Sequence, residues 1–253
     1  MLLVIAVVLM LAFILTKRRF LGFLGWFLFG VYWLTNIPYY LSICDYYNTA
    51  IMVGAFILFT LIAYTILRTR RLEVLIGVTS FSALAAIFYF PFAMISWLKR
   101  AIIGAVVSQT FTLGHILGFD FVRLDFNRLG YKGKHVEIIL ACTGIQSMAL
   151  FAGATLGIRA KWNRKIMAFL ISVPVIYILN LFRDVFVLVA YGEMWFGEDS
   201  FYIAHNVISK VLATLALVLI SLGVFKFLPE LADLIYNLKD ELMGVLHDRE
   251  NGA

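Results

Sequence analysis

The chain is poor in charged residues, in cysteine and in proline. Charged residues make up 14% of its 253 residues, whereas they make up roughly 25% of an ordinary soluble domain, so the composition excludes such a domain. Its two cysteines, Cys44 and Cys142, are too few for a disulfide framework. The motifs HExxH, CxxC and GxSxG are absent, so we expect no metal, no cofactor and no GxSxG serine hydrolase.

Hydrophobic residues account for 63% of the chain. Several apolar runs reach the roughly 20 residues that an α-helix needs to cross a bilayer, and lipid favours helices because their backbone groups bond within the segment. The sequence therefore predicts an all-α integral membrane protein, a multi-pass bundle of about seven transmembrane helices. The expected spans are about residues 2–16, 20–44, 49–67, 74–97, 142–158, 166–191 and 202–225.

The segments outside these spans predict three further elements. Residues 101–119 are apolar but carry Ser108, Gln109, Thr110 and His115, so a span, a re-entrant helix and a surface helix all stay open. Residues 120–140 alternate around a turn rich in Gly and Lys, which predicts a β-hairpin. Residues 229–253 repeat apolar positions at helical spacing, which predicts an amphipathic helix at the membrane surface and a tail. The positions of this stripe are Leu231, Ile235, Leu238, Leu242 and Leu246. We expect residues 1–228 to form the catalytic domain.

The basic residues predict the orientation. The net charge of +6 comes from cations in short loops, a pattern that reports topology rather than nucleic-acid binding, because cytoplasmic loops are enriched in Lys and Arg. Cationic segments 17–19, 68–71 and 159–165 then lie inside. We expect a cell-membrane protein with the loop 100–140 on the extracytoplasmic side and the C-terminal helix in the cytoplasm. The first apolar run lacks a basic start and a cleavage site, so it is expected to remain as a span.

Three reactive side chains then share one depth at the outer ends of late spans: Cys142, Arg183 and His205. Each has an ordinary alternative. Cys142 could be a small apolar filler or pair with Cys44, and His205 could be an interfacial hydrogen-bonding residue. Arg183 inside a span costs several kcal/mol unless it faces a polar partner, although its neighbour Asp184 or snorkelling to the headgroups could neutralise that cost.

Acyl transfer through a thioester is the chemistry that uses these three groups. A cysteine at a helix start near cations is expected to have a lowered pKa, which supplies a thiolate nucleophile. His205 would move protons and Arg183 would stabilise the oxyanion. A small-solute transporter or channel, with Arg183, His205 and Lys210 lining a polar pathway, is the competing prediction, and a non-catalytic assembly subunit is a third.

The same residues carry a resemblance to a known family. The segments ACTGIQS around Cys142, NLFRD around Arg183 and AHN around His205 resemble the exosortase and archaeosortase family, and the ACTGIQ form is most similar to its archaeosortase A branch. The resemblance implies that Cys142, Arg183 and His205 are the catalytic residues. Neighbouring motif residues would bind or support the substrate: Thr143, Gly144, Gln146, Asn180, Asp184 and Asn206.

The family resemblance also implies the partners and the reaction. It predicts a membrane-embedded cysteine transpeptidase or protease acting on secreted surface proteins that end in a short motif of the Pro-Gly-Phe type, an apolar span and a basic tail. Cleavage would be coupled to lipid anchoring, with the amine headgroup of a lipid as the acceptor. The resemblance further implies an archaeal surface-layer context.

Overall fold

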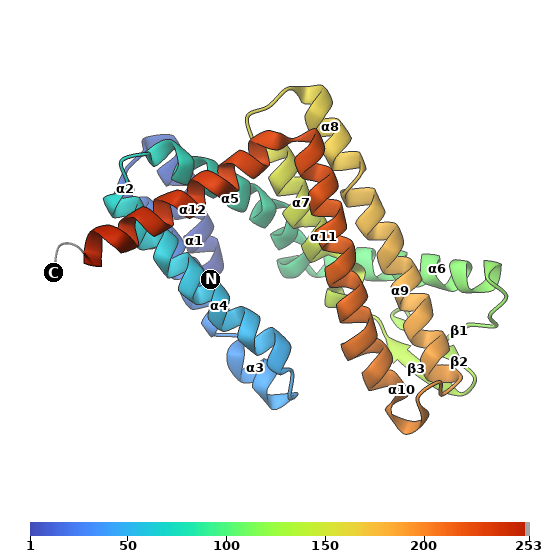
Figure 1. Ribbon diagram of the computed structural model, residues 1–253. Coiled ribbons are helices and arrows are strands. Elements are labelled where there is room, and N and C mark those ends of the chain that lie inside the picture. Colours follow the sequence, from blue (N-terminus) through green and yellow to red (C-terminus); the bar gives the residue numbers. More distant parts are fainter. Residues whose placement is uncertain (251–253) are drawn as a thin grey trace. The chain divides into compact units, whose positions relative to one another are not determined.

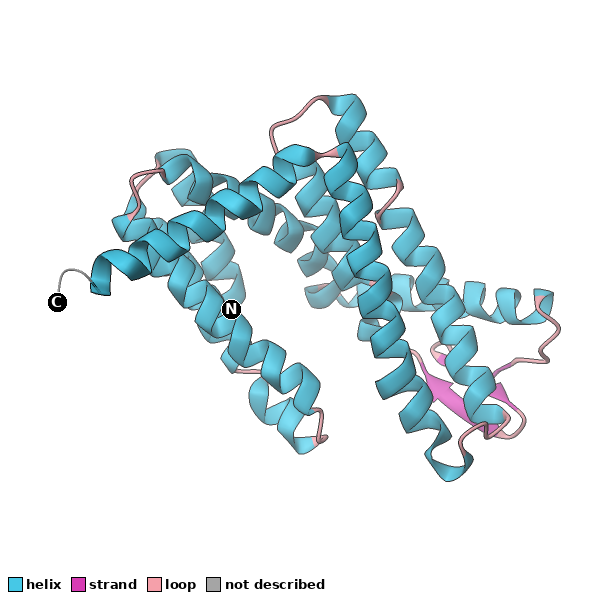
Figure 2. Ribbon diagram, viewed as in Figure 1, coloured by secondary structure: helices cyan, strands magenta, loops and turns pink. Residues whose placement is uncertain are grey.

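The computed structural model describes residues 1–250 (Figure 1). The side chains of residues 246 and 248–250 and the whole of residues 251–253 lie outside the described part, so the predicted role of Leu246 does as well. Within that part the chain is mostly helical, with one small sheet (Figure 2). Its contacts group it into two compact units, Met1–Leu84 with Gly157–Arg159 and Glu230–Ala253, and Ala85–Leu156 with Ala160–Pro229.

The first unit is a bundle with an aromatic core. Trp26 and Phe13 are fully buried in it, and the indole Nε1 of Trp26 donates a hydrogen bond of 2.9 Å to Thr79 Oγ1. This bond gives the one polar atom of the ring a partner inside an apolar core. The unit contains α1 (Leu2–Thr16), α2 (Arg19–Leu34), α3 (Ile37–Ser42), α4 (Tyr46–Arg68), the first part of α5 (Leu72–Met94), and α12 (Pro229–Glu250).

Helix α12 confirms the predicted amphipathic helix. Part of its apolar stripe, however, contacts protein instead of the predicted membrane surface. Leu242 is buried in the core of the first unit, and Leu238 packs against that core. Glu241 accepts a hydrogen bond from Thr69 Oγ1 and lies 3.5 Å from Arg71 Nε. The stripe predicted for a membrane surface therefore packs in part on protein. The predicted division at residue 228 stays a prediction.

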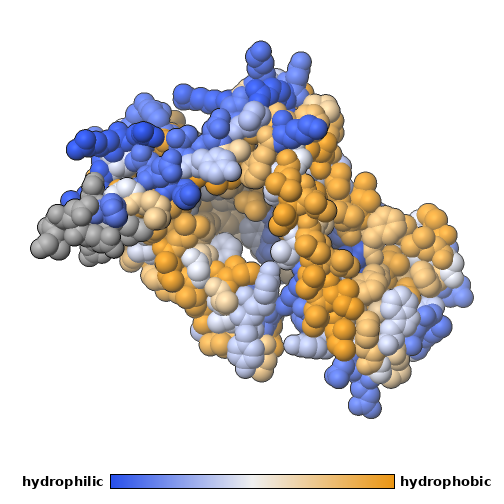
Figure 3. Space-filling model, viewed as in Figure 1, coloured by the Kyte–Doolittle hydropathy of each residue, from blue (hydrophilic) through white to orange (hydrophobic). Residues whose placement is uncertain are grey.

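The second unit contains the rest of α5 and every element that carries a predicted site residue. Its long helices, α9 and α11, present hydrophobic surface (Figure 3), and α11 exposes Leu212, Leu215 and Leu219. Exposed leucines along a helix are typical of a surface that faces lipid tails. The elements are α6 (Ser96–Ile116), β1 (Val122–Arg123), β2 (Arg128–Tyr131), β3 (Lys134–Glu137), η1 (Leu140–Thr143), α7 (Ile145–Gly157), α8 (Trp162–Leu170), α9 (Val173–Gly192), η2 (Gly197–Asp199), α10 (Ser200–Tyr202), the π-helix η3 (Ile203–Ile208) and α11 (Ser209–Phe227).

The apolar helices correspond one to one with the predicted spans. Five segments are long and apolar enough to cross a membrane, and two shorter apolar helices account for the first and fifth predicted spans. Helix α6 covers most of residues 101–119 as one continuous helix and does not meet these criteria, so a span is the least favoured of the three open interpretations. The long segments are Arg19–Ser42, Tyr46–Arg68, Leu72–Met94, Trp162–Gly192 and Gly197–Phe227; the short ones are Leu2–Thr16 and Ile145–Gly157.

The predicted hairpin is confirmed as β2 and β3, and β1 adds a third strand that the alternation did not predict. The antiparallel order is β1-β2-β3, with Leu129 opposite Val136. Lys132 and Gly133 form the turn with φ of 47° and 79°, and two positive φ values are typical of a tight two-residue hairpin. Leu129 and Ile138 on the inner face join a core with Val106 of α6 and Leu188 of α9.

The sixth predicted span is divided in two by its proline. Helix α8 ends at Leu170, and α9 begins at Val173 with Pro174 in its first turn. Proline suits that position because the first amides of a helix have no intrahelical partner and its fixed φ matches the helix. Helix α9 is therefore a separate helix from α8, and it carries Asn180, Arg183 and Asp184.

Candidate active site

Cys142 lies in the short 3-10 turn η1, just before α7. The hydroxyl of Thr143 donates a 2.8 Å hydrogen bond to the Leu140 carbonyl and accepts one of 3.4 Å from the Ile145 amide. This side chain is fully buried. Its two hydrogen bonds connect the turn to Ile145, the first residue of α7. Thr143 therefore supports the cysteine by fixing the local backbone, because both of its bonds are to main-chain groups.

Gly144 and Asn180 bring this turn against α9. Gly144 has φ of 71°, which glycine adopts readily, and a Cβ there would lie 3.2 Å from Asn180 Cγ. The Asn180 amide Nδ2 donates a 2.7 Å hydrogen bond to the Cys142 carbonyl and a 3.3 Å hydrogen bond to Asp184 Oδ2. One side chain of α9 thus holds both the backbone of the cysteine and the carboxylate one turn further along.

Arg183 contacts two groups with two different nitrogens. Its Nη2 lies 3.5 Å from His205 Nδ1, and its Nη1 lies 4.0 Å from Asp184 Oδ1. Because a guanidinium can only donate, this contact is a hydrogen bond only in the tautomer of His205 whose Nδ1 carries no proton. Asp184 therefore supplies the negative charge next to Arg183, as the simple alternative predicted, and the contact with His205 is additional to that ion pair.

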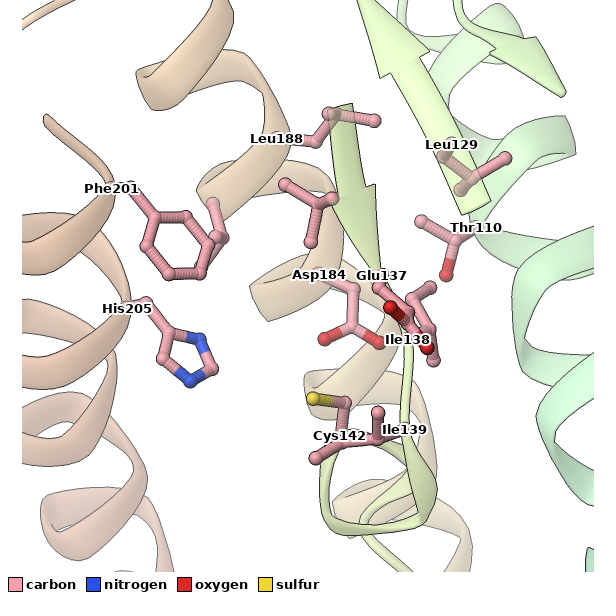
Figure 4. A pocket seen from close by; sticks show the side chains of 12 residues that line it. Thr110, Leu129, Glu137, Ile138, Ile139, Cys142, Asp184, Leu188, Phe201 and His205 are labelled. Atoms are coloured by element: carbon pink, nitrogen blue, oxygen red, sulfur yellow. The ribbon is translucent and has the colours of Figure 1, made fainter. Parts of the chain in front are cut away.

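His205 lies in the π-helical turn Ile203–Ile208, and its ring stacks on Phe201 with centroids 5.2 Å apart and planes at 7°. Single π-helical turns inside α-helices are frequent at functional sites, because the extra residue redirects side chains. This turn presents the imidazole toward the cysteine turn and α9 (Figure 4).

A cavity of about 160 Å³ joins these elements, and Cys142, Asp184 and His205 line it together. Figure 4 shows the Cys142 sulfur pointing into the space below Asp184 and toward His205. The other residues of its wall come from α6, the sheet, α9 and α10: Thr110, Leu129, Val136, Glu137, Ile138, Ile139, Val187, Leu188 and Phe201.

A second, larger cavity of about 660 Å³ lies along α9 and α11. Arg183, Asn180 and Gly144 line it with Ser147 and Ser209, and the rest of its wall is apolar. Arg183 therefore borders the large cavity while its contact partner His205 borders the small one.

The predicted lowering of the Cys142 pKa is wrong. Burial of the thiol, followed by the negative charge of Asp184, raises the pKa of Cys142, and the hydrogen bond with the Ile139 backbone and the charge of Arg183 only partly oppose this. The cysteine is also not the first residue of a membrane helix, because Thr143 and Gly144 separate it from α7. In the resting protein the thiol is therefore favoured over the thiolate.

Two predicted support residues lie outside this arrangement. Gln146 is exposed on α7, where its Nε2 donates a 3.2 Å hydrogen bond to the Tyr89 hydroxyl. Asn206 follows His205 in the π-helical turn but lines neither cavity, and Lys210 of α11 lines neither as well. Both cysteines are free in the structure.

Sequence reasoning assigned no role to Thr110, Glu137 or Phe201, all of which line the small cavity. Thr110 is a polar residue in an apolar stretch of the sequence, but that position alone did not indicate which residues it would lie next to. Glu137 begins the segment that leads to Cys142. No local signal pointed to Phe201, because its stacking on His205 depends on the π-helical turn.

Comparison with known proteins identifies the family. A family model described as transmembrane exosortase matches residues 1–222. The chain belongs to the transmembrane exosortase family. This confirms the predicted family, and membership indicates a membrane-embedded processing enzyme rather than the small-solute transporter that polar residues alone allowed.

Two curated relatives of this exosortase-family protein are named archaeosortase A. The one from Haloferax volcanii is 28% identical over 263 residues, covering 90% of this chain and 86% of the relative. The one from Natronomonas pharaonis is 24% identical over 253 residues, covering 88% and 78%. No solved structure matches the chain.

Proposed function

We propose that this exosortase-family protein is a cysteine transpeptidase or protease that removes the C-terminal sorting signal of secreted surface proteins. The observation that carries the proposal is the shared cavity of Cys142, Asp184 and His205, with Arg183 against the histidine ring. A nucleophile and groups that can accept its proton line one small cavity, and a cation lies against one of them; acyl transfer requires such groups. The active site is proposed to face the extracytoplasmic side, and the signal is proposed to be of the Pro-Gly-Phe type.

In the first step the Cys142 sulfur attacks the scissile carbonyl, and its proton leaves to a base of the cavity. Because the resting thiol is protonated, removal of this proton belongs to the reaction itself, with Asp184 or His205 as the acceptor. The tetrahedral oxyanion is stabilised by Arg183. Collapse breaks the C–N bond, the leaving amine takes up the proton, and the substrate carbonyl stays on the sulfur as a thioester.

In the second step an amine, which we propose to be a lipid headgroup, attacks the thioester. The amine loses a proton to the same base, the C–S bond breaks, and the Cys142 thiol is regenerated. Attack by water would give a free acid instead. The proposed cycle therefore needs no metal or redox cofactor, since its two acyl transfers exchange only protons.

Hydroxylamine tests the thioester directly. Membranes containing the protein and a surface protein with the three-part signal are incubated with hydroxylamine, and the new C-terminus is analysed by mass spectrometry. We expect a C-terminal hydroxamate, because hydroxylamine intercepts a thioester faster than water does. The Cys44→Ala variant should give the same product, since Cys44 is exposed and lies outside the small cavity. A processed substrate without hydroxamate would contradict the thioester, and an intact substrate would contradict the proposed activity.

A further inference from the structure

Strand β3 leaves one edge of the sheet open. The strand order is β1-β2-β3, and no strand within residues 1–250 pairs with the other side of β3. In a hairpin with a two-residue turn the residues that flank the turn, Tyr131 and Lys134, exchange hydrogen bonds, and bonded pairs then alternate. The backbone N–H and C=O groups of His135 and Glu137 therefore point to the open edge.

The open edge leads directly to the candidate nucleophile. Four consecutive residues, Val136 to Ile139, line the small cavity, and the chain then turns through η1 to Cys142 (Figure 4). His135 and Glu137 are exposed. Backbone groups of an edge strand are a ready template for a further strand, and here that template ends beside the sulfur.

Thr110 gives a second, independent indication that the cavity takes a polar ligand. Its side chain is 1% exposed, and its Oγ1 has no hydrogen-bond partner among the described residues. A buried hydroxyl without a partner costs free energy, so such groups are expected to acquire a partner in the working complex. Thr110 lies on α6 and borders the same cavity as Val136 to Ile139.

We infer that the substrate segment preceding the scissile bond binds as an added strand on the open edge of β3, with Thr110 contacting it near Cys142. This inference rests on the proposed function and names the binding mode at that same site. Addition of a strand supplies main-chain hydrogen bonds, and the cavity supplies side-chain selection. Its volume of about 160 Å³ is close to that of an apolar cavity that holds a benzene ring, about 150 Å³, so it has room for one side chain of that size.

The order of elements predicts a parallel arrangement. The chain runs from β3 through Cys142 into the apolar helix α7. A substrate whose apolar span follows its cleavage site runs in the same order, from an extended segment through the scissile bond into a span. The two chains therefore lie parallel, and His135 offers both its N–H and its C=O to the added strand.

Proline at His135 tests the strand pairing. His135→Pro removes an N–H that points to the open edge and leaves the ladder with β2 in place, and edge strands tolerate proline. The matched control, His135→Ala, removes the side chain only. We expect His135→Pro to lower kcat/KM for signal cleavage roughly tenfold, mainly through KM, as for one lost hydrogen bond, and His135→Ala to stay within about twofold of the unmodified protein. Equal cleavage by the two variants would overturn the strand pairing, whereas no cleavage by the unmodified protein would overturn the proposed function.

Photocrosslinking keeps the inference testable if the proline variant does not fold. In a Cys142→Ala background, p-benzoylphenylalanine at His135 should capture the substrate on the residues preceding its cleavage site. The same probe at Val122, an exposed residue of β1 on the opposite edge of the sheet, is the matched control and should capture none. Capture from neither position, or from both equally, would overturn the inference.

Thr110→Val removes the unpaired hydroxyl at nearly constant shape. We expect KM to rise about five- to tenfold with little change in kcat, while the melting temperature stays equal or rises, because Thr110 Oγ1 makes no hydrogen bond within the described part of the chain that the change could remove. Thr110→Ser should restore KM. A fall in melting temperature with unchanged KM would show a purely structural role and contradict the contact with substrate.

Discussion

Cys142→Ala is expected to abolish signal cleavage, with a loss of roughly 10⁴-fold or more, as for the removal of a catalytic nucleophile. The change removes only the sulfur from a half-buried position, and the backbone hydrogen bond from Asn180 to the Cys142 carbonyl is independent of the side chain. The fold should therefore persist while the chemistry stops. The measurement is the mass of a tailed surface protein after incubation with membranes containing the variant, beside the melting temperature of the purified protein.

Two companion variants sharpen this result. Cys142→Ser keeps a nucleophilic atom of similar geometry, but a hydroxyl is a far weaker nucleophile without its own activating base, so we expect it to be nearly as inactive. Cys44→Ala should retain full activity, since this exposed residue lies outside the small cavity. Normal cleavage by Cys142→Ala in a folded protein would remove the cysteine from the mechanism.

The helices and the hairpin could be predicted from the sequence because their signals are local. A run of apolar residues determines a membrane helix with little reference to its neighbours, and all the predicted spans have counterparts. The turn at Lys132 and Gly133 likewise carries its own signal, because it needs two residues with positive φ. The strand β1 is only two residues long, which is too short for alternation to reveal.

The candidate site was only partly predictable because its geometry depends on contacts between distant segments. Motif spacing brought Cys142, Arg183 and His205 into one hypothesis with Asp184 as a support residue, but it did not indicate that the Asp184 carboxyl acts on the pKa of the cysteine. The sign of the predicted pKa shift was wrong for this reason, since burial and a neighbouring carboxylate outweigh the cation. A π-helical turn and an unpaired hydroxyl also leave no periodic signal, so η3 and Thr110 became visible only in three dimensions.

Arg183→Lys is expected to lower kcat about 10²-fold while leaving the fold intact. In the structure two nitrogens of one planar fork contact His205 and Asp184 at the same time, and lysine has a single nitrogen that cannot reproduce both contacts. Loss of one preorganised donor from an oxyanion site costs roughly 10²- to 10³-fold in kcat. The measurement is kcat for signal cleavage by the purified variant, together with its melting temperature.

Arg159→Lys is the matched control for this substitution, because Arg159 is exposed between α7 and α8 and the change conserves charge in the same way. It should leave kcat within about twofold of the unmodified protein. The contrast separates the planar geometry at position 183 from its charge, since both variants keep a cation. Full activity of Arg183→Lys would mean that a point charge beside His205 is sufficient. Arg183 would then act by its charge alone, and the planar guanidinium would not be needed to position the imidazole relative to the oxyanion.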